Sequence, residues 1–235
     1  MDSLTMRQTQ VQVRVNSFVR SVYNWMAIGL ALTGFIAYAV ANTPEVRNVI
    51  FGSNIVFFGL IIAQLALFFI ISSRIYRMQA GTATALFIIY SALNGATLSA
   101  IFLAYAQSTI TSTFFVCSGT FVACSIYGWT TRRDLTSMGG FLTMGLIGIV
   151  IASLVNLFIQ SSAVSTIVSY IGVLVFVGLT AYDTQDIKKM AMAQPDSIDA
   201  GAVRKGAILG ALKLYLDFIN LFLMLLRIFG GSRDK

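Results

Sequence analysis

Long apolar runs alternate with short polar segments along this chain, and each run is about the length of a membrane-crossing helix. An α-helix needs about 20 apolar residues to cross the hydrocarbon core of a bilayer. Because the polar segments are short, successive helices should run antiparallel. The pattern predicts an all-α integral membrane protein, a bundle of seven transmembrane helices. The seven apolar segments are Val22–Ala41, Asn54–Ser73, Ala83–Ala106, Thr113–Trp129, Gly140–Phe158, Val164–Tyr182 and Ala207–Phe229.

Composition agrees with a protein that has no separate soluble domain. Hydrophobic residues make up 57% of the chain and charged residues 11%, whereas soluble domains are about 25% charged. We expect a cytoplasmic N-terminal segment over 1–21, a single membrane domain over 22–230 and a C-terminal tail over 231–235. The longest polar stretch, Asp183–Lys205, is predicted to be a loop, as is the connection Asn42–Ser53.

Basic residues are concentrated in alternate polar segments. One set of segments holds 11 basic residues, whereas the other holds Arg47 alone. Cytoplasmic segments of membrane proteins carry the excess of Lys and Arg, so the N-terminus should be cytoplasmic. The net charge of +7 therefore reflects orientation, and no nucleic-acid partner is expected. The 11 residues are Arg7, Arg14, Arg20, Arg74, Arg77, Arg132, Arg133, Lys188, Lys189, Arg204 and Lys205.

The last apolar segment carries Asp217 near its middle. A carboxylate at that depth is costly unless it has a partner or a cavity, so it is a functional-site hypothesis. A full crossing would also put Arg233 and Lys235 on the side opposite the other basic residues. The segment is therefore either shielded inside the bundle or does not fully cross, and both alternatives place Asp217 in the interior. Lys213 at i−4 and Asn220 at i+3 are potential local partners.

The chain contains no histidine, which excludes the helical zinc-protease motif, serine–histidine catalysis and histidine pH sensing. No catalytic residues are expected. Cys117 and Cys124 would lie about 10 Å apart along one helix, too far for a disulfide, and are interpreted as packing residues. Chemistry that responds to protons must use Asp, Glu, Lys, Tyr or Cys, and because Glu45 is the only glutamate, we expect the aspartates to carry most of it.

Asp183, at the end of the sixth apolar segment, is the second candidate. It is either a solvated cytoplasmic carboxylate or a partner of Asp217 across neighbouring helices. Two carboxylates in an apolar site cannot both ionise comfortably, so such a pair would share one proton at low pH. Once ionised, Asp183 and Asp217 would form a cation site, and calcium favours oxygen ligands.

Other polar residues support two readings each. Arg74 and Arg77 end the second segment, either as a signal for orientation or as a counter-charge for an ionised aspartate. Gln64, Asn94 and Asn156 either line a path through the bundle or form hydrogen bonds across helices.

Four segments resemble the Bax inhibitor-1 family, also called the transmembrane Bax inhibitor motif family, in its bacterial branch. They are TAYDTQDIK, LGALKLYLDFINLFLMLLRIFG, YSALNGATLS and YGWTTRRDL. The resemblance implies a multi-pass protein of the bacterial inner membrane, a seven-helix bundle with the last helix at its centre. It further implies a pH-sensitive calcium leak gated by Asp183 (in YDTQ) and Asp217 (in YLDF). The family's latch arginine matches either Arg74 or Arg77.

The expected function is thus a pH-sensitive calcium leak channel, with transient Ca²⁺ and no tightly bound cofactor. An alternative is a regulatory protein that binds a membrane protease or another quality-control partner without transport. A proton-coupled transporter is a more remote alternative, since no internal repeat with paired broken helices stands out. An intramembrane aspartyl protease is equally remote, because Leu214-Tyr215-Leu216 precedes Asp217 where such enzymes have a Gly-x-Gly turn.

Overall fold

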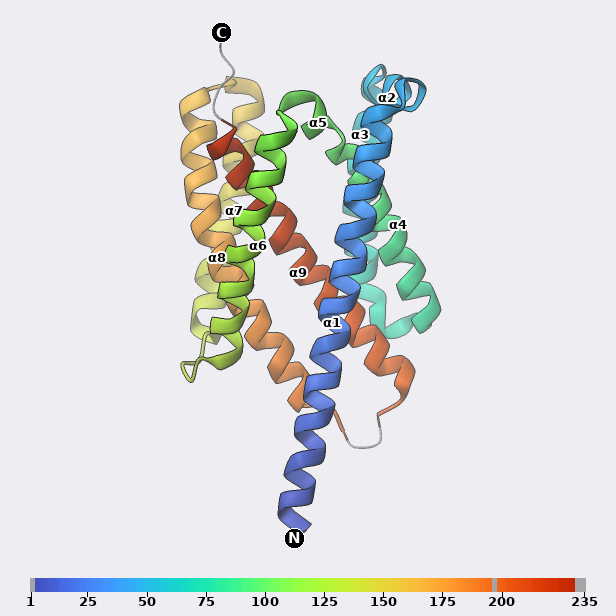
Figure 1. Ribbon diagram of the computed structural model, residues 1–235, viewed down its shortest axis with the longest axis vertical. Helices are drawn as coiled ribbons and strands as arrows, with labels where there is room; N and C mark the ends of the chain where they lie inside the picture. Colours follow the sequence, from blue (N-terminus) through green and yellow to red (C-terminus); the bar gives the residue numbers. More distant parts are fainter. Residues whose placement is uncertain (1–2, 196–197, 231–235) are drawn as a thin grey trace. The chain divides into compact units, whose positions relative to one another are not determined.

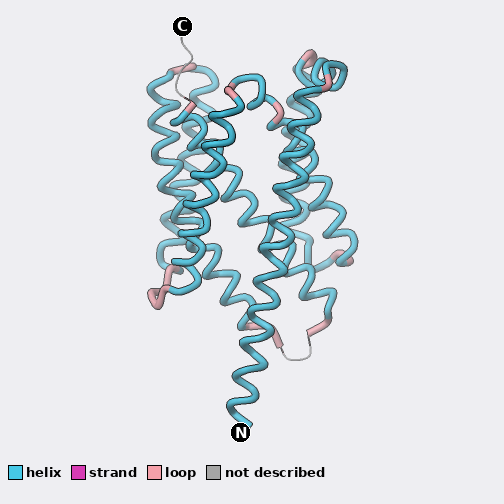
Figure 2. The backbone as a smooth tube through the Cα atoms, in the orientation of Figure 1, coloured by secondary structure: helices cyan, strands magenta, loops and turns pink. Residues whose placement is uncertain are grey.

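The structure is a computed structural model that describes residues 3–195 and 198–230, with side chains described from Thr9 onward. Within these residues the chain forms helices and no β-strand (Figures 1 and 2). The elements are α1 (Ser3–Asn42), α2 (Pro44–Phe51), α3 (Asn54–Arg74), the short 3₁₀ helix η1 (Ile75–Arg77), α4 (Ala80–Leu98), α5 (Ala100–Ala104), α6 (Gln107–Thr130), α7 (Thr136–Ile159), α8 (Ser162–Met192) and α9 (Ala200–Phe229).

Seven helical segments are long and apolar enough to cross a membrane, which confirms the predicted fold class. The last segment, α9, is the most buried, with 72% of its most apolar stretch inside the protein against 39% or less for the others. It is continuous over 30 residues, about 45 Å, which is long enough for a full crossing. The predicted tail over 231–235, with Arg233 and Lys235, lies outside the described residues, as does the side chain of Arg7.

The third predicted span, Ala83–Ala106, is divided at Ser99. Helix α4 ends at Leu98 and α5 begins at Ala100. The hydroxyl of Ser99 donates to the carbonyl of Ala96 at 2.7 Å. Serine side chains that bond back onto the preceding turn compete with the helix ladder and bend helices, which accounts for the break here.

The connection Asn42–Ser53, predicted to be a loop, contains the helix α2. Pro44 occupies the first turn of α2, where its fixed φ favours a helix and its missing N–H costs nothing. Ile50 of α2 is buried. One buried apolar residue and a favourable start are enough for a short helix that the polar composition concealed.

The prediction that Asp183–Lys205 forms a loop is also wrong, because α8 continues to Met192 and α9 begins at Ala200. The continuation follows from a buried face, since Ile187 and Ala191 lie four residues apart and are both buried. Asp183 therefore lies within a helix, nine residues before its end.

The chain divides into two compact units, and α9 contributes to both of them. Unit 1 comprises Met1–Ala104 and Met190–Tyr215. Its helices α1 and α4 pack closely at Gly95, where an added Cβ would lie 2.7 Å from the carbonyl oxygen of Thr33.

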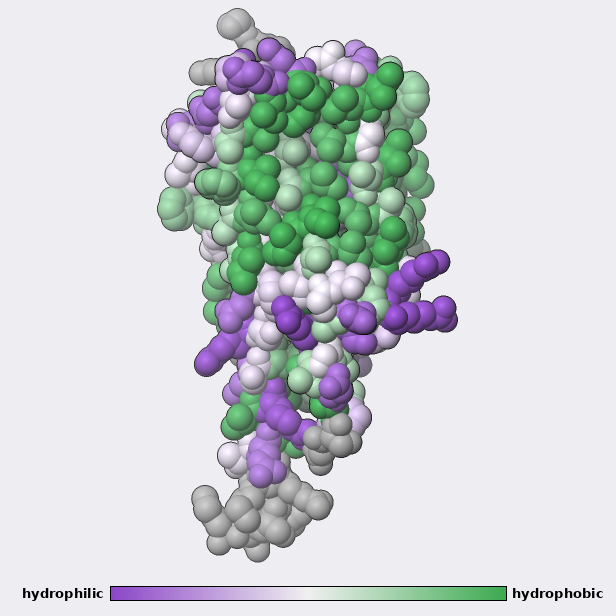
Figure 3. Space-filling model, turned by 90° about the vertical axis from the view of Figure 1, so that its right-hand side faces the viewer, coloured by the Kyte–Doolittle hydropathy of each residue, from purple (hydrophilic) through white to green (hydrophobic). Residues whose placement is uncertain are grey.

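Helix α3 of unit 1 exposes an apolar face at the protein surface. Every third or fourth residue of α3 is an exposed large apolar side chain, which is the spacing of one helix face. Figure 3 shows a broad hydrophobic surface with hydrophilic residues gathered above and below it, as a bilayer requires. The exposed residues of this face of α3 are Ile55, Phe58, Ile62, Leu65 and Phe69.

Unit 2 comprises Tyr105–Lys189 and Leu216–Lys235, hence α6, α7, most of α8 and the second half of α9. Its core includes Phe218, whose ring meets those of Phe114 and Phe121 edge-on at 5.7 and 5.4 Å. Cys117, buried on α6, lies with its Sγ 3.7 Å from the carbonyl oxygen of Phe218. Both cysteines are free, as predicted.

Candidate functional site

Asp217 lies in the part of α9 that belongs to unit 2 and is buried, with 4% of its surface exposed. Its predicted interior position is thereby confirmed. Asp183 is half-buried in α8, and it too belongs to unit 2. The two carboxylates that the sequence singled out therefore belong to one compact unit and to two of its helices.

Helices α8 and α9 meet within unit 2 at Gly172 and Met224. A Cβ atom at Gly172 would lie 2.8 Å from Cγ of Met224, so glycine allows a closer approach than any other residue. Phe176 and Asn220, one turn further along the two helices, line the same cavity. The approach of Gly172 to Met224 sets the register of the two helices, and the shared cavity of Phe176 and Asn220 agrees with an antiparallel arrangement.

That register determines the relative positions of the two aspartates. Asp183 follows Gly172 by 11 residues, and Asp217 precedes Met224 by 7 residues. At about 3.6 residues per turn, both intervals return to within about 20° of the same helix face. If both helices stay regular from this contact, we expect Asp183 and Asp217 on the faces that α8 and α9 turn toward each other, offset by four residues or about 6 Å along the axes.

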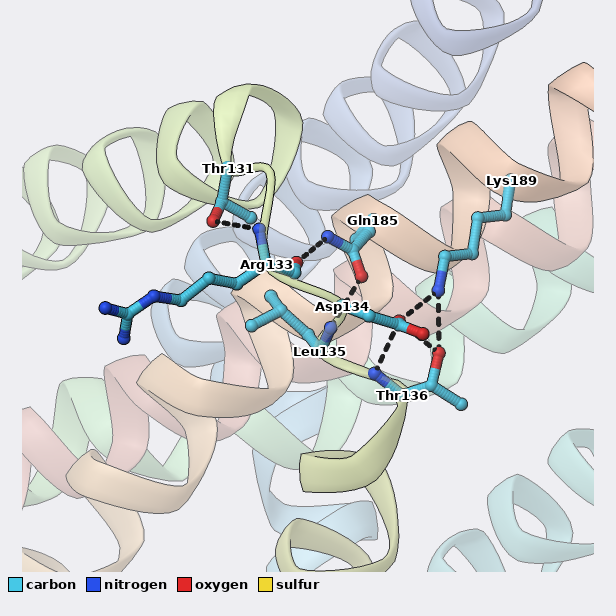
Figure 4. A network of polar contacts seen from close by, with 7 residues as sticks. All are labelled: Thr131, Arg133, Asp134, Leu135, Thr136, Gln185 and Lys189. Carbon is cyan, nitrogen blue, oxygen red and sulfur yellow. Dashed lines mark hydrogen bonds and ion pairs between the residues drawn. The ribbon is translucent and has the colours of Figure 1, made fainter.

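Two residues after Asp183, Gln185 ties α8 to the loop between α6 and α7 (Figure 4). Its Oε1 accepts the backbone N–H of Leu135 at 2.8 Å, and its Nε2 donates to the carbonyl of Arg133 at 2.9 Å. Sequence reasoning missed Gln185 because its segment was assigned to a loop. The helical spacing of Ile187 and Ala191 was the signal that could have found it.

The same loop carries an ion pair on its exposed side (Figure 4). The carboxylate of Asp134 accepts from Lys189 Nζ at 2.5 Å and from the hydroxyl and backbone N–H of Thr136 at 2.6 and 3.0 Å. The hydrogen bond from Lys189, followed by those from Thr136, holds the pKa of Asp134 well below its ordinary value. Together with Gln185, this pair fixes the loop on the end of α8 that follows Asp183.

Comparison with known proteins identifies the family of the chain. The family model described as "Inhibitor of apoptosis-promoting Bax1" matches residues 15–234. The chain belongs to the Bax inhibitor-1 family. It is 52% identical to "Inner membrane protein YbhL" of Escherichia coli (strain K12), a match that covers 99% of this chain and 100% of the relative. It is 44% identical to an "Uncharacterized protein" of Borreliella burgdorferi over the full length of both.

Family membership and seven apolar helices together make the chain a multi-pass membrane protein. In this Bax inhibitor-1 family protein, each of the two tryptophan rings forms a cation–π contact with a basic side chain. Lys188 Nζ lies 5.0 Å from the ring centroid of Trp129 in unit 2, and the guanidinium of Arg204 lies 5.4 Å from that of Trp25 in unit 1. Tryptophan and basic residues together are typical of a membrane surface.

The two arginines proposed as a latch lie in unit 1 and are both exposed. Arg74 is the last residue of α3, and Arg77 is the last residue of η1. Nearby, Lys205 Nζ donates to the carbonyl of Tyr76 at 3.2 Å, so this end of unit 1 is rich in basic groups. Whether either arginine serves as a latch in this family member stays a prediction.

The polar neighbours of Asp217 along α9 are half-buried. Asn220 donates to the carbonyl of Leu216 at 2.8 Å, within its own helix. Lys213, one turn before Asp217, is half-buried as well. Their predicted support of the aspartate stays a prediction.

Two of the amides predicted to be buried, half-buried Gln64 and buried Asn94, form different kinds of hydrogen bond. Gln64 of α3 donates to the carbonyl of Leu93 and to the hydroxyl of Thr97 on α4, at 3.3 and 3.2 Å. Asn94 donates to the carbonyl of Tyr90 in its own helix at 3.0 Å. Gln64 therefore forms a bond across helices, one of the two roles predicted for these amides.

Among the described residues, no group of three or more His, Cys, Asp or Glu side chains could hold a metal ion. A cation held by Asp183 and Asp217 would need backbone oxygens or water to complete its coordination, because calcium takes about 6–8 oxygen ligands.

Proposed function

We propose that this Bax inhibitor-1 family protein is a pH-sensitive cation leak channel, with calcium as the favoured ion, gated by Asp183 and Asp217. The observation that carries the proposal is the close contact of Gly172 with Met224, together with the 11- and 7-residue intervals to the two aspartates. On helices that stay side by side, the two carboxyl groups are about one turn apart along the axis.

Side-chain direction reduces this offset further. In an α-helix each side chain leans toward the N-terminus of its own helix. Because α8 and α9 run in opposite directions, Asp183 leans toward the level of Asp217, and Asp217 leans toward the level of Asp183. The two carboxyl groups thus converge, as a shared proton requires.

The proton then acts as the gate. At low pH the pair holds one proton in a hydrogen bond between the carboxyl groups, which keeps α8 and α9 together. As the pH rises and the proton leaves, attraction becomes repulsion between two carboxylates in an apolar surrounding. The separated carboxylates bind a cation, and the leak increases with pH.

We also propose that the protein lies in the bacterial inner membrane with its N-terminus in the cytoplasm. The inner membrane is named for the relative YbhL, which the chain matches over its full length. In unit 2, the four basic residues near Asp183 gather at the end where α6 finishes, α7 begins and α8 ends, which supports a cytoplasmic location for that end. These residues are Arg132, Arg133, Lys188 and Lys189.

Calcium flux into vesicles containing the purified protein tests the proposal. For a gate of one proton, the leak should rise by at most about tenfold per pH unit, with the higher rate at the higher pH. Asp183→Asn and Asp217→Asn should each remove this pH dependence, because the one remaining carboxyl group has no second carboxylate to repel it or to share its proton. Asp134→Asn, which removes an exposed carboxylate of the same unit, should leave it unchanged.

The opposite results are as informative. A pH-dependent leak that persists in both Asp183→Asn and Asp217→Asn would remove the two aspartates from the gate. A wild-type protein that passes no cation but co-purifies with a membrane protease would instead support the regulatory function, without transport.

A further inference from the structure

Unit 2 contains a cavity of about 530 Å³ between α7, α8 and the second half of α9. Ligand sites in proteins commonly measure about 300–1,000 Å³. The cavity is largely apolar, with a few polar side chains. Its lining consists of Leu146, Ile149, Val150, Ser153, Leu154, Asn156, Leu157, Ser165, Val168, Phe176, Asn220, Leu223, Met224 and Arg227.

The polar side chains of the lining are unevenly distributed. Asn156, Ser165 and Arg227 each lie within three residues of a helix end, namely the end of α7, the start of α8 and the end of α9. Leu146 and Phe176, by contrast, lie about 20 Å from those ends. Ser153 and Asn220 line the cavity further in, where Asn220 donates to the carbonyl of Leu216 in its own helix. The only charged group of the lining is thus at the mouth, and most of the interior is apolar, as the headgroup and acyl chain of a lipid require.

The side chains at the mouth of the cavity offer donors to a ligand that accepts hydrogen bonds. Asn156 Nδ2 donates to Ser165 Oγ at 2.8 Å, and Asn156 Oδ1 accepts the N–H of Ser161 at 3.0 Å, so the turn between α7 and α8 is held in place. A hydroxyl that accepts a bond still has its own hydrogen to donate. Ser165 and the guanidinium of Arg227 therefore offer donors at the same end of the cavity.

Arg227 supplies the charge. Its side chain is exposed, and none of the residues that line the cavity is acidic. Arg227 also lies at the end of unit 2 opposite the basic residues Arg132, Arg133, Lys188 and Lys189. The positive-inside rule accounts for basic residues at only one end, so it does not explain Arg227. A guanidinium at the edge of the hydrocarbon region needs an anion, and its planar fork matches a phosphate bidentately.

A second cavity of unit 2 differs from the first in the charge of its lining. It measures about 370 Å³ and lies near the other end of the unit, among residues of α6, α7 and α8 that include Cys124, Leu142 and Tyr182. Its lining carries no charged side chain. Such a cavity can take an acyl chain but has no group that selects a headgroup.

We propose that the larger cavity binds one anionic glycerophospholipid from the leaflet opposite the basic end of unit 2. The lipid phosphate pairs with Arg227 beside Ser165, and an acyl chain runs away from it along Val150 and Leu154, which line the cavity and are exposed at the protein surface. The cavity shares Asn220 and Met224 with the α8–α9 contact beside the proposed aspartate gate, but lipid binding does not require that gate. An anionic lipid is favoured over a zwitterionic one because the mouth offers a cation and no carboxylate.

Native mass spectrometry of the full-length protein, after removal of co-purified lipid, tests the site. Phosphatidylglycerol should bind about fivefold more tightly than phosphatidylcholine of the same chain length, the effect of one basic residue at a membrane surface. Arg227→Gln should abolish that preference. The matched control Arg132→Gln, which removes an exposed arginine at the opposite end of unit 2, should keep it.

Two further arms distinguish the lipid from other ligands. Ser153→Phe, which fills the cavity, should remove the bound lipid whatever its headgroup, whereas Cys124→Phe, which fills the smaller cavity, should keep the preference for phosphatidylglycerol. Glycerol 3-phosphate, which lacks acyl chains, should not displace the lipid. Retention of the preference in Arg227→Gln would overturn the proposal, and displacement by glycerol 3-phosphate at lipid-like concentrations would identify a soluble phosphate ester as the ligand instead.

Discussion

The two compact units of this protein bury different kinds of polar group. In unit 1 the fully buried hydroxyl of Tyr215 lies 2.7 Å from Thr33 Oγ1, and Thr33 donates to the carbonyl of Ser91 at 2.8 Å. These groups are neutral. Unit 2 instead buries the carboxyl group of Asp217 and half-buries that of Asp183.

The buried polar groups of unit 1 stabilise the fold, whereas those of unit 2 can also respond to pH. Hydroxyl groups that hydrogen-bond to each other keep the same charge over the physiological pH range. Buried carboxyl groups can change theirs. Among the acidic residues of unit 1 that the structure describes, Glu45 and Asp199 are both exposed. We therefore expect the interior of unit 1 to be insensitive to pH and that of unit 2 to respond to it.

The largest expected effect comes from the core of unit 1. Tyr215→Ala removes a ring that meets Phe87 and Tyr90 edge-on at 6.0 and 5.9 Å, together with the bond to Thr33. Replacing a buried aromatic residue with alanine lowers the free energy of unfolding by about 3–5 kcal/mol. Unfolding in increasing concentrations of a denaturing detergent measures this loss.

The control for that variant is Tyr215→Phe, which keeps the ring and removes the hydroxyl. It should lower the free energy of unfolding by about 1 kcal/mol and leave the pH dependence of the calcium leak unchanged. A changed pH response in Tyr215→Phe would contradict the separation of the two units into an insensitive and a responsive one.

Next in size is a pair of glycine substitutions, one in each unit. An added Cβ at Gly95 would collide with the carbonyl of Thr33 in unit 1, and one at Gly128 would collide with the carbonyl of Ala181 in unit 2. Overpacking of this kind costs about 1–3 kcal/mol of folding free energy. Gly95→Ala and Gly128→Ala should therefore both lower the unfolding midpoint in detergent.

The two glycine variants should differ in function, however. Ala181 is two residues before Asp183, so Gly128→Ala displaces the part of α8 that carries the proposed gate. We expect Gly128→Ala to change the pH at which calcium leak is half-maximal, while Gly95→Ala leaves that pH unchanged. Equal shifts in the two variants would show that the gate responds to general destabilisation.

A third comparison uses two glutamines. Gln185→Ala would leave the buried N–H of Leu135 without its acceptor at 2.8 Å, a loss of about 1–3 kcal/mol. Gln64→Ala loses longer bonds of 3.3 and 3.2 Å, for about 0.5 kcal/mol. Thermal unfolding of the two variants, with Gln185→Asn as a control that keeps the amide on a shorter side chain, measures the difference. A larger loss in Gln64→Ala would reverse the assignment.

The number of membrane-crossing helices could be predicted from the sequence because a bilayer imposes one length on every apolar run. The sequence did not predict how far the helices continue beyond the apolar runs. The segment after Asp183 is polar by composition, and its helical character depends on burial of Ile187 and Ala191, which requires knowledge of their tertiary neighbours. The same error hid Gln185 and the hydrogen bonds that hold the loop between α6 and α7.

Part of the candidate site could also be predicted from the sequence. An aspartate inside an apolar run is conspicuous, so Asp217 could be identified from its position alone. The relation between Asp217 and Asp183 could not, since it depends on the register of α8 against α9. That register is set by the contact of Gly172 with Met224, and a glycine in an apolar helix gives no indication of which side chain it will meet.

The smallest expected effect is at the surface of unit 2. The ion pair of Asp134 with Lys189 is exposed, and exposed pairs stabilise proteins little. Asp134→Asn should therefore lower the melting temperature by less than Gln185→Ala does. Lys189→Met should have a similarly small effect, and the double variant should lose less than the sum of the two single losses, because both variants remove the same ion pair.

The pH dependence of this pair has a defined sign. Lys189 and Thr136 hold the pKa of Asp134 below its ordinary value of 3.8, so the folded protein binds the proton less readily than the unfolded chain does. The stabilisation is complete above that value and is lost as the pH falls below it. Melting temperatures of wild type and Asp134→Asn should differ by a constant amount from pH 5 to pH 8 and begin to converge only as the pH falls below about 4. A difference that instead grew between pH 5 and pH 8 would mean that Asp134 shares the pH response proposed for Asp183 and Asp217.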